Sequence, residues 1–214
     1  SLTCPSNSTV ISTVPTAVTV PAPTVSDDCP GPITLTNSFN GTSNASGTYP
    51  VGTTTVVWTA TDGCGNSTTC SHTVTVGSPQ VRISQVYGGG GNTGTVYRQD
   101  FIELHNGGTL SQNLTGWSVQ FLAATGTGTW SVTNLPAANL APGQYLLVQQ
   151  AATTTLVAGQ AINLPTPDAT GTIDLGTSDG KIALCSSTTA LTGANPTGVS
   201  VVDFVGYGTT ANAR

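Results

Sequence analysis

The chain has 214 residues, of which only 6% are charged: nine are acidic, four are basic, and the formal net charge is −5. Globular proteins usually carry about 25% charged residues, so this surface relies on Thr and Ser, which make up more than a quarter of the chain. Four basic side chains are too few to neutralise a run of phosphates, which excludes nucleic acid as a partner. No apolar run approaches the ~18 residues of a membrane span, which excludes membrane insertion.

The first third of the chain predicts short β-strands separated by polar turns. The run 51–60 alternates apolar and polar residues, which places Val56, Trp58 and Ala60 on one face of a strand. The segment 37–47 is polar and predicts a loop. Other strands are expected around 18–25, over 33–35 and over 72–76. Strands at this spacing are typical of a small β-sandwich, and the polar, proline-bearing segment 77–80 predicts its boundary.

The second part of the chain repeats the pattern with different content. Each expected strand is short and flanked by Gly, Asn, Pro or Thr: 81–86, 101–104, 117–121, 145–149, 182–185 and 199–205. Alternation places two sets of apolar residues on common faces: Trp117, Val119 and Phe121, and then Val199, Val201 and Val205. Three successive threonines limit the segment 151–156 to a helical turn at most. The chain is therefore expected to be all-β, with tandem sandwiches over 1–77 and 78–214.

The cysteines are concentrated in the first 70 residues, which indicates disulfides in an oxidising compartment: Cys4, Cys29, Cys64 and Cys70. A zinc site is the alternative, but Cys64 and Cys70 are more widely spaced than the usual pair of zinc ligands. Cys185 lies in the alternating run 181–185 and is expected to be a buried thiol. A catalytic thiolate would need a nearby histidine, and the chain has only His72 and His105.

A longer pattern runs through residues 1–76. It consists of Cys4-Pro5, the Asp27-Asp28-Cys29 turn, Tyr-Pro-Val-Gly-Thr at 49–53, Thr-Ala-Thr-Asp at 59–62, and Cys64-Gly-Asn66 through Cys70 to Val76. This pattern resembles a hyalin-repeat (HYR) domain, an extracellular module. The resemblance implies an immunoglobulin-like fold with an adhesive or spacer role rather than catalysis. It also implies that all four cysteines meet at one end of the sandwich, paired as Cys4–Cys70 and Cys29–Cys64, although sequence alone allows three pairings.

Residues 81–210 carry a second set of blocks in a fixed order. These are ISQVYGGGG at 83–91, DFIEL at 100–104 with Asn106, LTGWS at 114–118, LAPGQY at 140–145, DGKIA at 179–183 and VDFVGY at 202–207. The blocks resemble a lamin-tail domain of the bacterial secreted type. The resemblance again implies an immunoglobulin-like sandwich, used as a non-catalytic module of secreted nucleases, phosphoesterases and surface proteins.

Two segments of this second part hold residue types that active sites use. The glycine run 88–91 is similar to a phosphate-binding loop, but the Lys-Ser/Thr pair and the following helix are missing, so a flexible loop is expected. On a strand, Glu103 and His105 share a face, whereas Asn106 points the other way. Asp100 lies close by in sequence, and a second converging carboxylate, such as Asp203, would have to come from elsewhere. No catalytic site is therefore expected.

Three carboxylates of the first domain form a candidate calcium site. Asp27, Asp28 and Asp62 are expected at the same end of the sandwich, and oxygen ligands from loops suit a hard cation. The alternative, which we favour, is that Asp27 and Asp62 cap turns through hydrogen bonds to the backbone, since no 12-residue calcium loop is present. No other cofactor is expected.

Carbohydrate chemistry is suggested by two further features. Trp130 lies in a Gly/Thr-rich stretch and is predicted to be exposed, which makes it the candidate carbohydrate contact, whereas Trp58 and Trp117 are expected in the cores. Five Asn-x-Ser/Thr sequons mark surface loops and are candidate glycosylation sites: Asn7, Asn40, Asn44, Asn66 and Asn113.

These observations predict a secreted bacterial protein, extracellular or at the cell surface, with no enzymatic activity. The leading interpretation is a fibre, sheath or surface-layer subunit that joins copies of itself head to tail, because few charges protect its strand edges. The alternative is a non-catalytic targeting or carbohydrate-binding appendage of a larger secreted hydrolase, with extracellular polysaccharide as its partner. A third hypothesis, a hydrolase that uses Asp100, Glu103 and His105, lacks converging groups.

Overall fold

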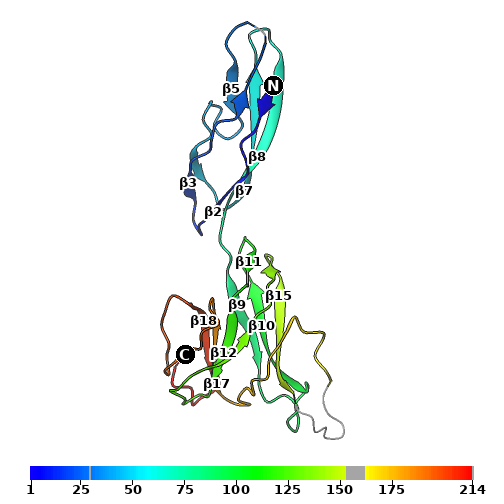
Figure 1. Ribbon diagram of the computed structural model, residues 1–214, viewed down its shortest axis with the longest axis vertical. Helices are drawn as coiled ribbons and strands as arrows, with labels where there is room; N and C mark the ends of the chain where they lie inside the picture. The colour runs from blue at the N-terminus through cyan, green and yellow to red at the C-terminus, as the bar shows by residue number, and fades with distance from the viewer. Residues whose placement is uncertain (29, 153–161, 214) are drawn as a thin grey trace. The chain divides into compact units, whose positions relative to one another are not determined.

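The computed structural model describes residues 1–28, 30–152 and 162–213. All regular structure within these ranges is β-strand, which confirms the expected all-β class (Figure 1). The chain divides into two compact units, Ser1–Ser78 and Pro79–Arg214. Among the described residues there is no helix with the length and apolar character that crossing a membrane requires.

The first unit is an immunoglobulin-like sandwich of eight strands: β1 Leu2–Thr3, β2 Ser8–Ile11, β3 Thr16–Val18, β4 Thr24–Val25, β5 Thr34–Asn37, β6 Gly47–Tyr49, β7 Gly52–Thr61 and β8 Ser67–Gly77. One layer is a four-stranded sheet in the order β2-β8-β7-β5, and the other consists of the pairs β1-β4 and β3-β6. The core between the layers contains Tyr49, Trp58 and Val74, all fully buried.

The long β7–β8 hairpin follows directly from the alternation in the sequence (Figure 1). Val56, Trp58 and Ala60 are buried on one face of β7, as predicted. The opposite face carries threonines, and Thr53 and Thr75 hydrogen-bond across the strands at 3.1 Å. The side chains of one face thus form the core, while the other face presents hydroxyl groups to solvent.

The second unit is a larger immunoglobulin-like sandwich, with the strands β9 Val81–Tyr87, β10 Gln99–Asn106, β11 Gln112–Asn113, β12 Ser118–Leu122, β13 Ser131–Asn134, β14 Asn139–Leu140, β15 Tyr145–Ala152, β16 Ala169–Thr170, β17 Gly180–Cys185 and β18 Val201–Tyr207. Its two main sheets have the orders β16-β15-β10-β9 and β13-β12-β17-β18, and β11 pairs with β14. Ile102, Leu104, Val148, Ile182 and Leu184 fill the core between the sheets.

Several elements differ from the sequence-based expectation. Seven short strands of two to four residues were not predicted: β1, β2, β6, β11, β13, β14 and β16. β18 begins at Val201 rather than at 199, and the Val199 side chain is fully exposed instead of sharing a face with Val201. The helical turn considered for 151–156 falls largely outside the described residues, since only 151 and 152, the end of β15, are described.

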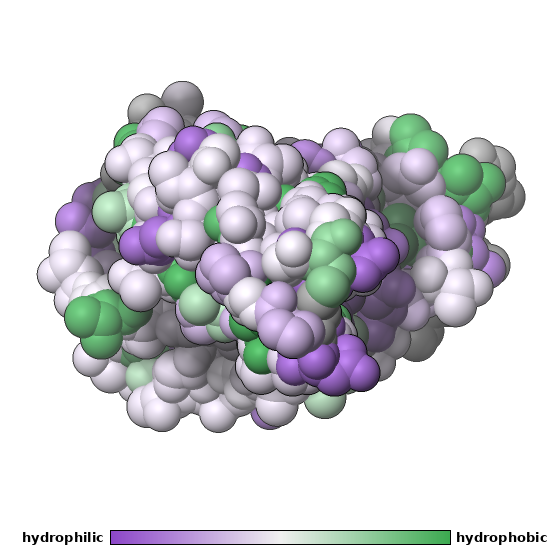
Figure 2. Space-filling model, turned by 90° about the horizontal axis from the view of Figure 1, so that it is seen from above, coloured by the Kyte–Doolittle hydropathy of each residue, from purple (hydrophilic) through white to green (hydrophobic). Residues whose placement is uncertain are grey.

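The surface reflects the composition. Figure 2 shows a face that is mostly pale, which corresponds to residues of intermediate hydropathy such as Thr, Ser and Gly, with isolated apolar and strongly hydrophilic residues between them. A surface of this kind has little charge with which to repel a similar surface.

Candidate functional site

The acid/base candidates of β10 do not converge. The strand places Asp100, Ile102 and Leu104 on its buried face, whereas Glu103 and His105 lie on the opposite face, as their spacing predicted. The Glu103 carboxylate accepts a hydrogen bond from the Ser84 hydroxyl at 2.7 Å. His105 stacks on Tyr145 with 4.3 Å between the ring centroids. Each polar group is engaged separately, so the three residues of the hydrolase hypothesis do not form one site.

Asp100 organises the glycine-rich segment 88–91. Its buried carboxylate accepts hydrogen bonds from the Gly90 N–H at 2.5 Å and from the Leu175 N–H at 2.7 Å. Burial raises the pKa of Asp100, and these backbone hydrogen bonds act in the opposite direction. A Cβ added at Gly90 would lie 2.2 Å from the carbonyl carbon of Gln99. The segment is a loop, as expected, and its glycines permit close backbone packing.

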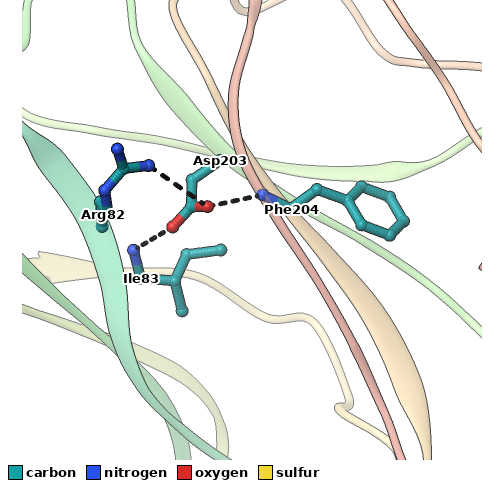
Figure 3. Close-up of polar contacts among 4 residues, drawn as sticks. All are labelled: Arg82, Ile83, Asp203 and Phe204. Atoms are coloured by element: carbon teal, nitrogen blue, oxygen red, sulfur yellow. Dashed lines mark hydrogen bonds and ion pairs between the residues drawn. The ribbon is translucent and has the colours of Figure 1, made fainter. Parts of the chain in front are cut away.

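Asp203 joins the edges of the two sheets of the second unit (Figure 3). Its Oδ2 accepts a hydrogen bond from the Ile83 N–H of β9 at 2.9 Å, and its Oδ1 accepts one from the Phe204 N–H at 3.0 Å. Arg82 Nη1 lies 3.9 Å from Oδ1, in a pair in which Asp203 is 19% exposed and Arg82 is 63% exposed. Asp203 thus accepts a hydrogen bond from a backbone N–H of the edge strand β9, which is then not available to another strand. Asp203 does not form a site with Asp100 or Glu103.

One carboxylate of the first unit, that of Asp62, accepts hydrogen bonds mainly from the backbone. The Asp62 carboxylate accepts hydrogen bonds from the N–H groups of Cys64 and Asn66 and from the Asn66 side-chain amide. The hydrogen bond from the Asn66 side chain is the main reason that the pKa of Asp62 is lowered. Asp62 therefore caps the turn, as the favoured alternative predicted.

Two of the three predicted calcium ligands do lie near one another. Asp27 and Asp62 line one surface pocket of about 220 Å³, and Asp28 is not among its lining residues. The described part of the chain holds no group of three or more His, Cys, Asp or Glu side chains arranged to hold a metal ion. Calcium binding at Asp27, Asp28 and Asp62 stays a prediction.

The Cys4–Cys70 disulfide is present, as predicted, with 5.8 Å between the Cα atoms. It links the start of the first unit to β8 and excludes both residues as zinc ligands. The predicted Cys29–Cys64 pair depends on Cys29, which lies outside the described residues, so this pair stays a prediction. Cys185 is a buried free thiol, and burial raises its pKa to about 11, which disfavours the reactive thiolate.

Trp130 does not form an exposed carbohydrate platform, so that prediction is wrong. The residue is 2% exposed, its Nε1–H donates to the Gly193 carbonyl at 3.0 Å, and its ring packs edge-on against Phe204. The reason is the β17–β18 connection. The Leu191 carbonyl of this connection accepts a hydrogen bond from the Trp130 N–H, so the segment covers the outer face of β17. Trp58 is fully buried as predicted, and Trp117 packs against the core of the second unit.

Lys181, beside Trp130, is a buried charged residue that was not predicted from the sequence. Its ammonium is buried and donates to the carbonyls of Gly126 at 2.7 Å and Ala194 at 3.1 Å, and to Asn212 Oδ1 at 2.6 Å. Burial lowers the pKa of Lys181. The apolar run 182–185 could have indicated its burial. Such a run is typical of a strand buried on both faces, and Lys181 directly precedes it in the same strand. The arrangement ties three separate segments together and has no open side for a substrate.

All five predicted sequons lie at exposed positions. The Asn40 amide nitrogen donates to the Asn44 carbonyl, and the Asn66 amide nitrogen donates to Asp62. The other three asparagines use their carbonyl oxygens as acceptors from neighbouring N–H groups: Asn7, Asn44 and Asn113. Glycosylation at any of the five stays a prediction, and the last three present their amide nitrogens more openly.

Comparisons with known proteins agree with the two resemblances. Residues 1–76 match the HYR domain, and residues 74–209 match the Lamin Tail Domain. The comparison with curated proteins found no significant match. Among solved structures, the chain is similar to a DUF4876 family protein from Bacteroides thetaiotaomicron, with 14% identity, coverage of 93% of this chain and 76% of that chain, and a TM-score of 0.44.

The order of the two matches is the order that the residue patterns predicted, and both domains have immunoglobulin-like folds. The second match covers more than half of the chain. The chain therefore belongs to the Lamin Tail Domain family, with an HYR domain preceding its lamin-tail domain.

Proposed function

We propose that this protein is a non-enzymatic structural protein, secreted by a bacterium, that assembles with copies of itself into an extracellular fibre or surface layer. The observation that carries the proposal is a pair of immunoglobulin-like sandwiches in which only 6% of residues are charged. Strand edges normally carry charges that prevent edge-to-edge association, so their scarcity favours assembly. The Cys4–Cys70 disulfide and the HYR domain support secretion into an oxidising environment.

The polar groups support a structural rather than a catalytic role. Asp100 holds the glycine-rich segment, Asp203 joins two strand edges, and Asp62 caps a turn. A hydrolytic site would need such groups to converge on one reacting atom. Here each carboxylate has backbone N–H groups as its partners, which is the pattern of a scaffold.

Negative-stain electron microscopy of the native secreted material tests the proposal directly. Ordered filaments or a lattice are the expected result. Dispersed single particles at every protein concentration tested would overturn it. The material should be purified without refolding or tags, so that neither an added segment nor misfolded protein disturbs contacts between copies.

A second candidate function is a polysaccharide-binding appendage of a larger secreted hydrolase, and one observation favours it. The Tyr145 side chain is 59% exposed, and its ring is supported from behind by His105. A supported, exposed aromatic ring is a suitable surface for stacking on a sugar. Affinity electrophoresis of the whole chain in polysaccharide gels should then show retardation that Tyr145→Ala abolishes. Equal mobility of both proteins in every polysaccharide would contradict this function.

A further inference from the structure

The edge strand β2 of the first unit has backbone groups that no other strand uses. β2 pairs only with β8, in parallel, and the Ser12 N–H donates to the Gly77 carbonyl at 2.9 Å. Backbone groups of successive strand residues point to opposite sides, so Val10, two residues before Ser12, also directs its N–H and C=O toward β8. The N–H and C=O groups of Thr9 and Ile11 therefore point away from the sheet. Within the described residues, no hydrogen bond reaches them.

The side chains around this edge are apolar and uncharged. Ile11 is 67% exposed and Val14 is 60% exposed, among the highest values for large apolar residues of the chain. The segment 8–14, Ser-Thr-Val-Ile-Ser-Thr-Val, contains five β-branched residues, no charge, no proline and no glycine. Such a segment on a sheet edge is a strong candidate for pairing with another strand.

One edge strand of the second unit, β9, is protected. Asp203 occupies the Ile83 N–H of the edge strand β9, and Arg82 adds a charge at the same place. No strand of the first unit carries Lys, Arg, Asp or Glu, because its acidic residues lie at 27, 28 and 62, outside the strands. β5, the other edge of the same sheet, is also uncharged, so β2 is distinguished by its outward-pointing backbone groups and by the exposed side chains of Ile11 and Val14.

We propose that β2 of one copy pairs in antiparallel orientation with β2 of a second copy, about a two-fold axis at Val10. This inference rests on the proposed self-assembly and specifies one of its contacts. In this register Thr9 of each copy lies opposite Ile11 of the other, and each such pair exchanges two N–H···O=C hydrogen bonds. The two four-stranded sheets then join into one continuous sheet. Because this contact is isologous, it closes a pair of molecules, and a filament needs a second contact elsewhere.

Analytical ultracentrifugation of the whole chain over a range of concentrations tests this pairing. Ile11→Lys should weaken dimerisation by at least about tenfold, because it places a charge at two symmetric positions of a desolvated strand pair. Val57→Lys is the matched control, since Val57 is 38% exposed on the same face but on the inner strand β7. This control should associate like the wild type.

The possible outcomes distinguish failure of the β2–β2 pairing from failure of the proposed self-assembly. If Ile11→Lys and the wild type associate equally, the β2 contact is wrong while self-assembly still stands. If the wild type is monomeric at all concentrations, both are wrong. Circular dichroism verifies that each variant is folded. Thr9→Pro provides a second test, because it removes an outward-pointing N–H while leaving the bonds of Val10 to β8 intact, and it should also prevent pairing.

Discussion

His72 is a buried histidine whose surroundings require the neutral imidazole. Trp58 Nε1–H donates to His72 Nδ1 at 3.2 Å, so the proton of the neutral ring lies on Nε2, a buried atom with no partner within the described residues. A second proton would place a donor opposite the indole N–H and a charge on a buried side chain. Burial accordingly lowers the pKa of His72.

This environment predicts that acid destabilises the first unit. The unfolded chain takes up a proton at the ordinary histidine pKa near 6.5, whereas the folded unit takes it up only at lower pH. The stability contributed by neutral His72 is therefore present above pH 6.5 and is lost as the pH falls toward the folded-state pKa. Calorimetric unfolding of the wild type at pH 7.5 and pH 5.5 should show this loss, and His72→Phe should reduce it. His105→Gln, on the exposed face of β10, should leave it unchanged.

Asp100 provides a second prediction at the residue scale. Asp100→Ala leaves the buried N–H groups of Gly90 and Leu175 without an acceptor, and each such loss costs about 1–3 kcal/mol. We expect the second unit to lose roughly 2–4 kcal/mol in the free energy of urea unfolding. Asp174→Ala removes a neighbouring exposed carboxylate and should change the free energy by less than about 0.5 kcal/mol. Equal effects of the two substitutions would contradict the assigned role of Asp100.

At the scale of the strands, Asp203 is expected to keep β9 and β18 from pairing with foreign strands. Asp203→Ala frees the Ile83 N–H and should cost about 1–2 kcal/mol while promoting aggregation on storage, measured by urea unfolding and light scattering. Arg82→Ala removes only the exposed partner at 3.9 Å and should cost less than about 1 kcal/mol, without aggregation. Aggregation of Arg82→Ala to the same extent would assign the protection to charge rather than to the backbone contact.

The strands also show how far the sequence alone was informative. Alternation predicted β7 and its buried Trp58 correctly, because one face of that strand meets water and the other meets the core. The Gly/Thr-rich surroundings of Trp130 predicted exposure wrongly, because its burial depends on the β17–β18 connection folding over the sheet. The position of a long connection is set by contacts between residues far apart in sequence, such as Gln120 with Leu191, which no local period encodes.

The same distinction holds for the candidate sites of the whole molecule. The Cys4–Cys70 disulfide was predictable from the domain resemblance, since that pattern carries the topology with it. The partners of Asp100, Asp203 and Lys181 were not, because most of them are backbone groups. Nearly every residue has such groups, so the amino-acid sequence does not indicate which of them a given side chain will contact.

The disulfide has a consequence for how the first unit responds to mechanical force. Cys4 and Cys70 are separated by 66 positions in the sequence, and the bond joins the beginning of the unit to its last strand. When a force pulls on Ser1 and Gly77, the load passes through the sulfur atoms, and the residues between the cysteines are bypassed. Roughly 220 Å of extended chain is thereby kept out of the load path.

Single-molecule pulling should therefore show almost no lengthening of the oxidised first unit and a gain of roughly 220 Å of contour length after reduction. Full extension under oxidising conditions would contradict this load path. A domain built in this way transmits tension with little extension, and a reductant makes the same domain extensible.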